Sequence, residues 1–404
     1  MLSVEEAQRR VRAAFRPLGS EQVSLTEALG RVLALDVAAR VTQPPAAVSA
    51  MDGYAVRAAD VAKVPARLRI VGYAPAGAAD PGRVGAGEAV RIFTGGPLPA
   101  GADAIVIQED TAAEGDHVVV NEAAPAGHYV RPAGLDFAMG DVGLAAGRLL
   151  TARDIGLAAA MNVPWLRVRR RPRVAILATG DELAMPGEPV GPNRIVSSNG
   201  PALAAFVAAC GGTPSLLGIA ADDRAALQRM AAEAAGADLL ITSGGASVGD
   251  HDLIQQALGE RGLELDFWQI AMRPGKPLIF GRIGPTPLLG LPGNPVSSLV
   301  CATIFLRPAL DVMLGRAEPE RPPATARLGA DLEANDSRQD YLRARLTYDD
   351  AGRAIATPFT RQDSSMLSHL AHADCLIVRP PRAAAAAAGA TVEIVLLAGG
   401  ALSI

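Results

Sequence analysis

Apolar runs that end in loops of glycine, proline and serine are the clearest pattern in this chain, and three of them lie in residues 237–298. They read ADLLITSGGASVGDHD, WQIAMRPGKPLIFG and LLGLPGNPVSS, and each loop leads into a helical pattern. Leu239, Leu240 and Ile241 form a continuous apolar run, as expected for a strand buried on both faces of a sheet. Because parallel strands end at one edge of their sheet, the pattern predicts a single cleft at that edge.

The same alternation extends over residues 173–315. The strand-like runs are VAILATG, LLGIA, LLITSGG, PLIFG and PLLGLPG. Helices are expected after Asn199, Asp223 and Asp250, and a long helix is expected to reach Leu314. This order is typical of a doubly wound α/β domain.

The flanking segments predict smaller units. Helical spacing predicts a helix over residues 4–16, a short one capped by Thr26 and a third at 153–161. Short strands between glycine and proline turns at 66–135 predict an inserted all-β module. Residues 318–323 predict a linker, and the strands after it predict a second β module.

Composition narrows the class of protein. A chain of 404 residues is long for one core. The net charge of −4 gives no overall basic field, so neither nucleic acid nor a membrane surface is expected as a partner. The three cysteines, Cys210, Cys301 and Cys375, are widely spaced, so we expect no disulfide framework and no zinc cluster. With no secretory leader and no long apolar run recognised, the sequence predicts a soluble cytoplasmic protein.

The loops of the predicted cleft combine backbone donors, hydroxyls, cations and carboxylates. Ser243, Gly244 and Gly245 can expose backbone N–H groups, and Asn294 with Pro295 predicts a helix whose positive end faces the cleft. The remaining charged and hydroxyl side chains of these loops are Arg273, Lys276, Ser247, Ser297, Asp250 and Asp252. This set suits a phosphorylated or oxyanionic ligand together with a hard divalent metal.

Other site patterns fit less well. Gly275-Lys276 is followed by Pro277, so there is no ATP-binding phosphate loop, and no full dinucleotide fingerprint follows a strand. Residues 245–249 match the G-x-S-x-G nucleophile elbow, which keeps a serine hydrolase using Ser247 as an alternative. Its base would have to be His369 or His372, in a different predicted module.

Acidic residues in loops are further candidates. Each has a structural interpretation as a turn residue or helix cap, and capping is favoured for Asp223 and Asp250. Together they favour a magnesium site with acid/base chemistry, because several should lie where strands of one sheet end. These carboxylates are Asp52, Asp136, Glu182, Asp222, Asp250 and Asp252.

A set of motifs in order along nearly the whole chain carries a family resemblance. The motifs are SAMDGYAVR, IFTGGPLPAGADAIV, VRPAGLD, LATGDEL, SSN, ITSGGASVGDHD, RPGKP, GLPGNPVSS, RQDYLR and QDSSMLSHLAHADC. The chain resembles the molybdopterin molybdenumtransferases of the MoeA type, whose eukaryotic relative is the E domain of gephyrin. The resemblance implies Mg²⁺-dependent reaction of adenylylated molybdopterin with molybdate, which releases AMP and gives molybdenum cofactor.

The resemblance also implies a four-part homodimer that works with other proteins of molybdenum cofactor biosynthesis. The parts would be an elongated, discontinuous dimerisation region at 1–50 and 137–172, the inserted β domain at 51–136, the molybdopterin-binding α/β domain at 173–320 and a C-terminal β barrel at 321–404. Each cleft would lie between the α/β domain of one subunit and the insert of the other.

Carried over onto this sequence, the resemblance implies roles for single residues. The catalytic carboxylates would be Asp52, Asp136, Glu182, Asp222 and Asp252, with Glu182, Asp222 and Asp252 as metal ligands. The substrate-binding residues would be Thr94, Arg131, Ser243, Gly244, Gly245, Ser247, Arg273, Lys276, Pro292, Asn294, Pro295, Ser297, Arg338 and Ser364. Gln269 and Arg273 depart from the family pattern, since some relatives have a basic residue at the first position and lysine is frequent at the second. A non-catalytic scaffold of the gephyrin kind keeps the same fold and stays an alternative.

Overall fold

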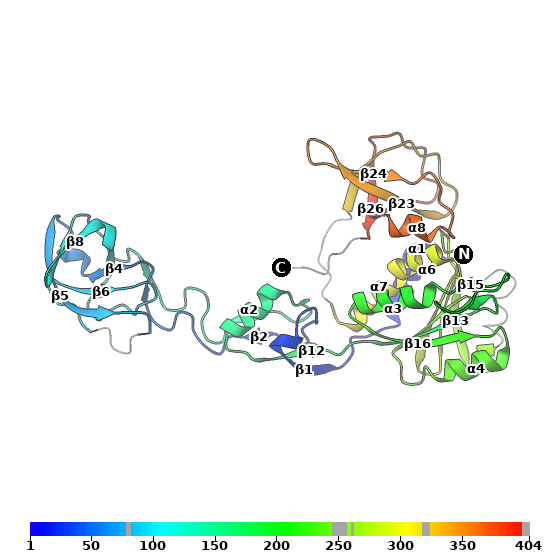
Figure 1. Ribbon diagram of the computed structural model, residues 1–404, viewed down its shortest axis with the longest axis horizontal. Helices are drawn as coiled ribbons and strands as arrows, with labels where there is room; N and C mark the ends of the chain where they lie inside the picture. The colour runs from blue at the N-terminus through cyan, green and yellow to red at the C-terminus, as the bar shows by residue number, and fades with distance from the viewer. Residues whose placement is uncertain (78–81, 245–256, 260–261, 317–323, 398–404) are drawn as a thin grey trace.

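The protein is an elongated chain of several bodies, and Figure 1 shows it with its longest axis horizontal. The computed structural model describes residues 1–77, 82–244, 257–259, 262–316 and 324–397. The inserted β unit lies at one end, a small region around α2 and β12 lies in the middle, and the α/β domain with the C-terminal barrel lies at the other end (Figure 1).

A six-stranded sheet forms the centre of the α/β domain, in the order β16-β13-β17-β21-β20-β18. Its parallel strands are β13 (Arg173–Thr179), β16 (Thr213–Ala220), β17 (Leu239–Ser243) and β21 (Thr286–Leu291). All five residues of β17 are buried, which confirms the prediction of a strand covered on both faces. The sheet is therefore the expected parallel scaffold over four of its six strands.

The remaining two strands differ in direction. β20 (Pro277–Ile283) runs antiparallel to β21, and β18 (Leu263–Gln269) pairs antiparallel with β20, so β18 runs in the same direction as the parallel strands. Only Gly284 and Pro285 separate β20 from β21, and a parallel pairing would need a crossover of a dozen or more residues. Because β20 is reversed, its first residue still lies at the carboxyl edge of the parallel strands.

Alternation along β13 explains why helices cover both faces of the sheet. Val174 and Ile176 belong to a core shared with α1, α3, α6 and α7, whereas Ala175 and Leu177 face a second core that contains Leu227 of α4. Successive strand side chains point to opposite faces, so both faces need a cover. The helices are α3 (Asn199–Ala209), α4 (Arg224–Ala232), α6 (Pro295–Cys301) and α7 (Arg307–Met313). The doubly wound prediction is confirmed.

The predicted long helix runs from α6 to α7 through a π-helical segment, η4 (Ala302–Leu306). Pro308 follows that segment, has no backbone N–H and would clash with the carbonyl of residue 304 in a regular helix; a π segment accommodates such a break. The stretch Pro295–Met313 has a mean hydropathy of 1.5, enough by length and composition to cross a membrane, but 67% of it is buried within the protein. It is a core helix of the α/β domain.

The N-terminal region pairs distant segments. Helix α1 (Val4–Ala13) begins at Ser3, whose Oγ accepts the N–H of Glu6 at 3.2 Å. The helix expected from a Thr26 cap is wrong in detail: only the 3₁₀ turn η1 (Leu25–Glu27) forms, and it begins at Ser24, whose N–H donates to Glu27. The other elements of this region are β1 (Ser20–Ser24), β2 (Val37–Ala38), β11 (Val142–Leu144), α2 (Ala152–Ala160) and β12 (Trp165–Arg169).

The two β units match the predicted modules. The insert carries a six-stranded sheet of β4 (Gly53–Val56), β5 (Ala66–Ala74), β6 (Glu88–Ile92), β7 (Ala104–Ile107), β8 (Thr111–Glu114) and β9 (His117–Val120), flanked by η2 (Ala58–Asp60), η3 (Gln108–Asp110) and the pair β3 (Val48–Ser49) and β10 (Val130–Arg131). The C-terminal unit closes through β22 (Ala324–Leu328), β23 (Gln339–Tyr348), β24 (Ala354–Pro358), β25 (Cys375–Arg379) and β26 (Thr391–Leu396), because β23 pairs with both β24 and β25. It also contains α8 (Leu367–Ala371) and is the expected β barrel.

Candidate functional site

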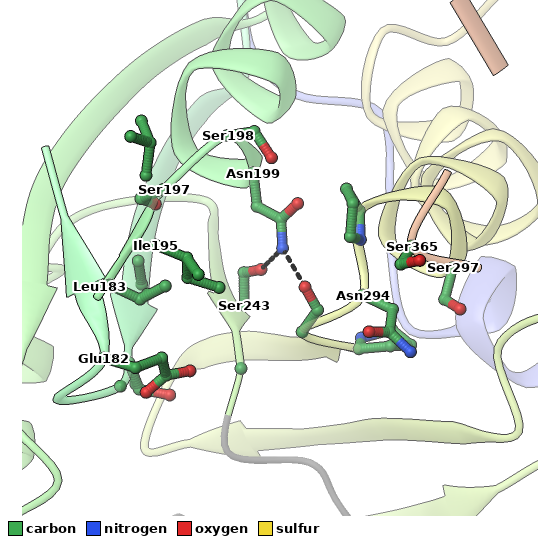
Figure 2. Close-up of a pocket in the computed structure, with 18 of the residues that line it drawn as sticks. Glu182, Leu183, Ile195, Ser197, Ser198, Asn199, Ser243, Asn294, Ser297 and Ser365 are labelled. Carbon is green, nitrogen blue, oxygen red and sulfur yellow. Dashed lines mark hydrogen bonds between the residues drawn. The ribbon is translucent and has the colours of Figure 1, made fainter. Parts of the chain in front are cut away.

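A cleft of about 810 Å³ lies at the carboxyl ends of β13, β17 and β21. Serine and asparagine side chains from several separate elements gather around it (Figure 2). The edge predicted from the alternation of strands and helices is therefore where a cavity forms. Its described lining residues are Ala178, Thr179, Gly180, Glu182, Leu183, Ile195, Val196, Ser197, Ser198, Asn199, Asp222, Ser243, Gly244, Pro277, Pro292, Gly293, Asn294, Pro295, Ser297 and Ser365.

Two glycines allow the floor of the cleft to close. Gly244 has a φ of +101°, and a Cβ there would overlap the carbonyl oxygen of Thr179. A Cβ on Gly293 would meet the Cα of Gly244 at 3.5 Å, so the two loops touch backbone to backbone. Only glycine fits position 244, because its conformation is strained for other residues and the space is already filled.

Asn199 links two loops of the cleft. Its Nδ2 donates to Ser243 Oγ at 2.8 Å and to the carbonyl oxygen of Gly293 at 2.7 Å, as the dashed lines in Figure 2 show. A single amide thus fixes the distance between the end of β17 and the loop before α6. The sequence predicts a helix start at Asn199 and includes this residue in the SSN motif, but it gives Asn199 no role in the site.

Helix α3 points its N-terminus at the cleft, where Ser197, Ser198 and Asn199 line the wall. Ser198 stands at the N-cap without a side-chain hydrogen bond to the helix. The first N–H groups of a helix lack partners within it and carry partial positive charge, so this end of α3 favours an anion.

Two carboxylates, Glu182 and Asp222, line the same cleft. Gly180 has a φ of +144°, a backbone conformation that is strained for other residues, so the turn before Glu182 favours glycine. The backbone N–H of Asp222 donates to Asp181 Oδ1 at 3.0 Å, which holds the two loops together. Both residues were predicted, and the structure brings them together.

The barrel contributes the wall near α6. Ser365 lines the cleft, whereas the predicted Ser364 is not among the lining residues and accepts a hydrogen bond from Asn294 Nδ2 at 2.9 Å. Asn294 occupies the N-cap position of α6 as predicted, but its side chain does not cap the helix. Pro295 and Ser297 line the cleft, and Pro292 closes it from the end of β21.

The sequence predicts that Arg273 and Lys276 share this cleft, but the structure places Arg273 at a different pocket. Arg273 is ion-paired with Asp340 and, at 3.4 Å, with Asp336, and it lines a second pocket of about 420 Å³ at the barrel. Its short strand β19 (Met272–Arg273) pairs with β23 of the barrel, which carries the side chain away from the cleft. Lys276 is half-buried just before Pro277, which does line the cleft.

The other residues implied by the resemblance lie elsewhere in this chain. Arg338 donates to Asp336 at 2.7 Å and holds the pKa of that carboxyl low, at about 2. Asp52 and Thr94 contact each other in the insert, where the Thr94 N–H (2.7 Å) and hydroxyl (2.9 Å) lower the pKa of Asp52. Two more, Arg131 in the short strand β10 and Asp136 in the chain that returns from the insert, are exposed. The insert is remote from the cleft within one chain (Figure 1).

Part of the predicted site lies outside the described residues, namely Gly245, Ser247, Asp250 and Asp252. Of the two histidines proposed as bases for a hydrolase, His369 stacks on Phe359 at 5.0 Å within the barrel. Its Nδ1 lies 3.2 Å from the carbonyl oxygen of Arg361. His369 is therefore engaged in the barrel.

Sequence reasoning missed much of the cleft wall. The residues not predicted as site residues include Thr179, Ile195, Val196, Ser197, Ser198, Asn199, Gly293 and Ser365. The motifs LATGDEL and SSN gave a signal for several of them, but no spacing rule connects residues 195–199 to the strand ends. They reach the cleft because β14 (Leu183–Ala184) pairs with β15 (Ile195–Val196) beside the end of β13.

Comparison with known proteins agrees with this architecture. Three family profiles match in order: the MoeA N-terminal region (domain I and II) over residues 2–162, a probable molybdopterin binding domain over 175–312 and the MoeA C-terminal region (domain IV) over 325–397. The doubly wound domain with the cleft thus falls in the molybdopterin-binding class.

Whole-chain relatives are more specific. Molybdopterin molybdenumtransferase 2 of Mycobacterium tuberculosis (strain CDC 1551 / Oshkosh) is 39% identical, over 98% of this chain and 99% of its own. Molybdopterin molybdenumtransferase of Nostoc sp. is 38% identical, over 89% and 85%. A molybdopterin biosynthesis moea protein from Pyrococcus horikosii has a crystal structure with a TM-score of 0.85 and 31% identity, over 99% of this chain and 100% of its own. The chain belongs to the MoeA family.

Proposed function

We propose that this protein is a molybdopterin molybdenumtransferase, which inserts molybdenum from molybdate into adenylylated molybdopterin and releases AMP. The observation that carries the proposal is the cleft, in which hydroxyls, glycine backbone and the N-terminus of α3 surround two carboxylates at one edge of the sheet. Its family membership agrees with it. Such a donor-rich cleft suits a substrate that carries phosphate groups.

The residues of the cleft divide the work by chemistry. Ser197 and Ser198, just before α3, would bind phosphate oxygens with their hydroxyls, and the N–H groups of Asn199 and Gly200 in the first turn of α3 would add backbone donors. Asn199 keeps Ser243 and Gly293 in register through its two hydrogen bonds, so the floor does not have to rearrange when the substrate binds. Binding by preset donors leaves more binding energy for the reaction.

Mg²⁺ fits the donor set that is described. Glu182 and Asp222 offer hard oxygen ligands, and the described lining of the cleft contains no histidine or cysteine. One or two carboxylates plus substrate phosphates are a common environment for Mg²⁺ in proteins, so Glu182 and Asp222 would hold it, with Asp252 as a further candidate. When bound, Mg²⁺ would neutralise charge on the phosphate groups during release of AMP.

Molybdate would be handled near the start of β20 and α6. Lys276 and Ser297 are the proposed ligands there, aided by Ser364 and Ser365 of the barrel. Arg273 is a weaker candidate than its charge suggests, because Asp340 and Asp336 already compensate its guanidinium. Lysine supplies a point charge that adapts to a tetrahedral dianion.

The complete site would form in a homodimer in the cytoplasm, alongside other proteins of molybdenum cofactor biosynthesis. Asp52, Thr94 and Arg131 lie on an insert that is remote from the cleft of their own chain (Figure 1). If they act on the substrate, a second copy must bring them to it.

The direct test is to incubate the purified protein with adenylylated molybdopterin, molybdate and Mg²⁺ and to measure AMP and molybdenum cofactor together. AMP release that depends on molybdate supports the proposal. If AMP is released but no molybdenum cofactor is formed, the protein is a hydrolase. If a dimeric protein forms neither product, a non-catalytic scaffold of the gephyrin kind is favoured.

A further inference from the structure

Helix α6 begins against the barrel. The N–H of Val296, in the first turn of α6, donates to the main-chain carbonyl oxygen of Ser364 at 3.2 Å. Asn294 is the N-cap residue of α6, but its side chain donates a hydrogen bond to Ser364 Oγ and does not cap the helix. The N–H of Val296, which has no partner within α6, is thus hydrogen-bonded to the C-terminal barrel. The partner belongs to residues 362–365, here called the latch loop.

The latch loop is held from behind by a buried arginine. Arg343 in β23 is 1% exposed, and its Nη1 donates to the carbonyl oxygen of Asp363 at 2.8 Å. Its backbone N–H and its Nε both donate to Gln362 Oε1, at 3.0 and 3.1 Å. Gln362 Nε2 returns hydrogen bonds to the carbonyl oxygens of Arg343 (3.0 Å) and Phe359 (2.9 Å).

The front of the loop is fixed in the same way. Asp363 Oδ1 accepts the N–H of Ser365 at 2.8 Å and its hydroxyl at 2.7 Å. Ser365 lines the cleft, so a chain of hydrogen bonds runs from the barrel interior through Asp363 to the cleft wall. The barrel and the cleft are therefore connected by specific polar contacts as well as by packing.

Stability alone does not account for an arginine at position 343. The Nη2 of Arg343 is buried and has no hydrogen-bond partner in the described part of the structure. Burial lowers the pKa of its guanidinium, which reflects the cost of removing the charge from water. An apolar side chain of similar size commonly gives equal or greater stability at such a position. The role of Arg343 is therefore better explained by the two directions in which its guanidinium donates, to Gln362 and to Asp363.

We propose that Arg343 and Gln362 are positioning residues of the transferase, which hold the latch loop against the first turn of α6 so that Ser364 anchors the start of the helix and Ser365 completes the cleft wall. The proposal deepens the proposed function and rests on it. Neither side chain lines the cleft. Their effect on the substrate would pass through Ser364, Ser365 and the alignment of α6.

The test compares Arg343→Met and Gln362→Ala with a matched control, Arg345→Met. Arg345 lies two residues along the same strand, is exposed and has its guanidinium carbon 5.6 Å from the centre of the Phe359 ring, and the hydrogen bonds to the latch loop described above come from Arg343. For both positioning variants we expect the KM for adenylylated molybdopterin to rise at least about tenfold, with kcat changing less. The control should keep wild-type constants.

A second measurement is independent of activity. Hydrogen exchange of the peptide spanning residues 294–301 should become faster in both variants, because the Val296 N–H loses its partner, and should stay unchanged in Arg345→Met. Arg343→Lys keeps the charge but not the fork, so it should be as impaired as Arg343→Met.

The outcomes separate the two claims. If the wild type releases no AMP, the proposed function fails, while exchange at 294–301 still reports on the latch. If KM and exchange are unchanged in the variants, or if Arg343→Lys restores wild-type values, the positioning role is wrong. Gln362 is half-buried, so Gln362→Ala keeps the test valid if Arg343→Met does not fold.

Discussion

Glu182 is one of the two described carboxylates that are proposed to hold Mg²⁺. It lines the cleft from the loop after β13, together with Ser198 just before α3 and Ser243 of β17 (Figure 2). Glu182→Gln keeps the size and removes the charge, so we expect weaker Mg²⁺ dependence and AMP release slower by at least about tenfold. Initial rates measured across a Mg²⁺ titration test this.

The matched control for that experiment is Glu188→Gln. Glu188 is exposed, lies in the same loop region and accepts the N–H of Met185 at 2.9 Å, but it does not line the cleft. Equal losses in both variants would show that the loop, and not the carboxylate of Glu182, matters.

At the residue scale, the sequence predicted the types of side chain better than their partners. Ser243, Gly244, Ser297 and Asn294 reach the cleft because each follows a strand end of one sheet. The position of Arg273 could not be read in this way, since its environment depends on a barrel strand more than 60 residues later, where Asp340 pairs with it. The sequence shows that Arg273 is charged, but it does not show which acidic residue the fold places beside it.

At the scale of single elements, Gly244 is the tightest constraint. Gly244→Ala would place a Cβ on the Thr179 carbonyl in a backbone conformation that costs about 1 to 3 kcal/mol for other residues. We expect a lower free energy of unfolding together with a large loss of transferase activity. Urea denaturation with parallel assays measures both.

Gly156→Ala is a control for which we expect the opposite change in the free energy of unfolding. Gly156 lies inside α2, and a Cβ there meets nothing within 4 Å. Alanine is favoured over glycine inside helices by about 0.5 to 1 kcal/mol, so this variant should be slightly more stable and fully active. A destabilised Gly156→Ala would mean that the comparison does not isolate the crowding at position 244.

The arginine-rich segment before β13 has a structural explanation. Arg170 forms two hydrogen bonds of 2.7 Å to Asp238, which also accepts the N–H of Arg173 at 2.8 Å. Burial raises the pKa of Asp238, but these bonds outweigh it, so the pKa lies below the ordinary value. The segment thus links the start of β13 to Asp238, the residue just before β17.

This pair predicts a pH dependence of stability. A carboxyl with a lowered folded pKa stabilises the fold above its unfolded pKa of about 4, and that contribution is lost as the pH falls through the folded value. Asp238→Asn should therefore cost about 1 to 3 kcal/mol at pH 7, and the difference from wild type should shrink below about pH 4. A difference that stays constant down to pH 3 in urea titrations would contradict the assignment.

Elements were predicted more reliably than the way in which they pair. The strands and helices of residues 173–315 follow from apolar runs and glycine loops, and the shared carboxyl edge follows from parallel order. The reversed direction of β20 was missed because apolar runs carry no direction; only the two-residue turn at Gly284 and Pro285 indicates it. The closure of the barrel through β23 and β25 is likewise a non-local pairing.

At the scale of the whole molecule, the distance between insert and cleft predicts complementation between variants. Asp52→Asn and Glu182→Gln would each damage every site of their own homodimer. If each site uses Glu182 of one chain and Asp52 of the other, a mixed dimer has one intact site. Unfolding and refolding the two together should restore about a quarter of wild-type activity, from statistical pairing of subunits.

Separate refolding of each variant is the control for that experiment. It should give only the residual activity of that variant. No recovery after mixing, in a preparation shown by sedimentation to contain dimers, would place Asp52 and Glu182 in sites that do not share subunits.

The division of apolar cores has a thermodynamic consequence. Tyr341, Leu376 and Val378 of the barrel belong to the same core as α1 and the main sheet, whereas the insert holds two cores of its own. Melting of the barrel should therefore be coupled to that of the α/β domain, and the insert should melt separately. We expect more than one calorimetric peak, and a ligand of the cleft should raise only the peak of the barrel and α/β unit. A single peak that moves as a whole would show that the three parts form one cooperative unit.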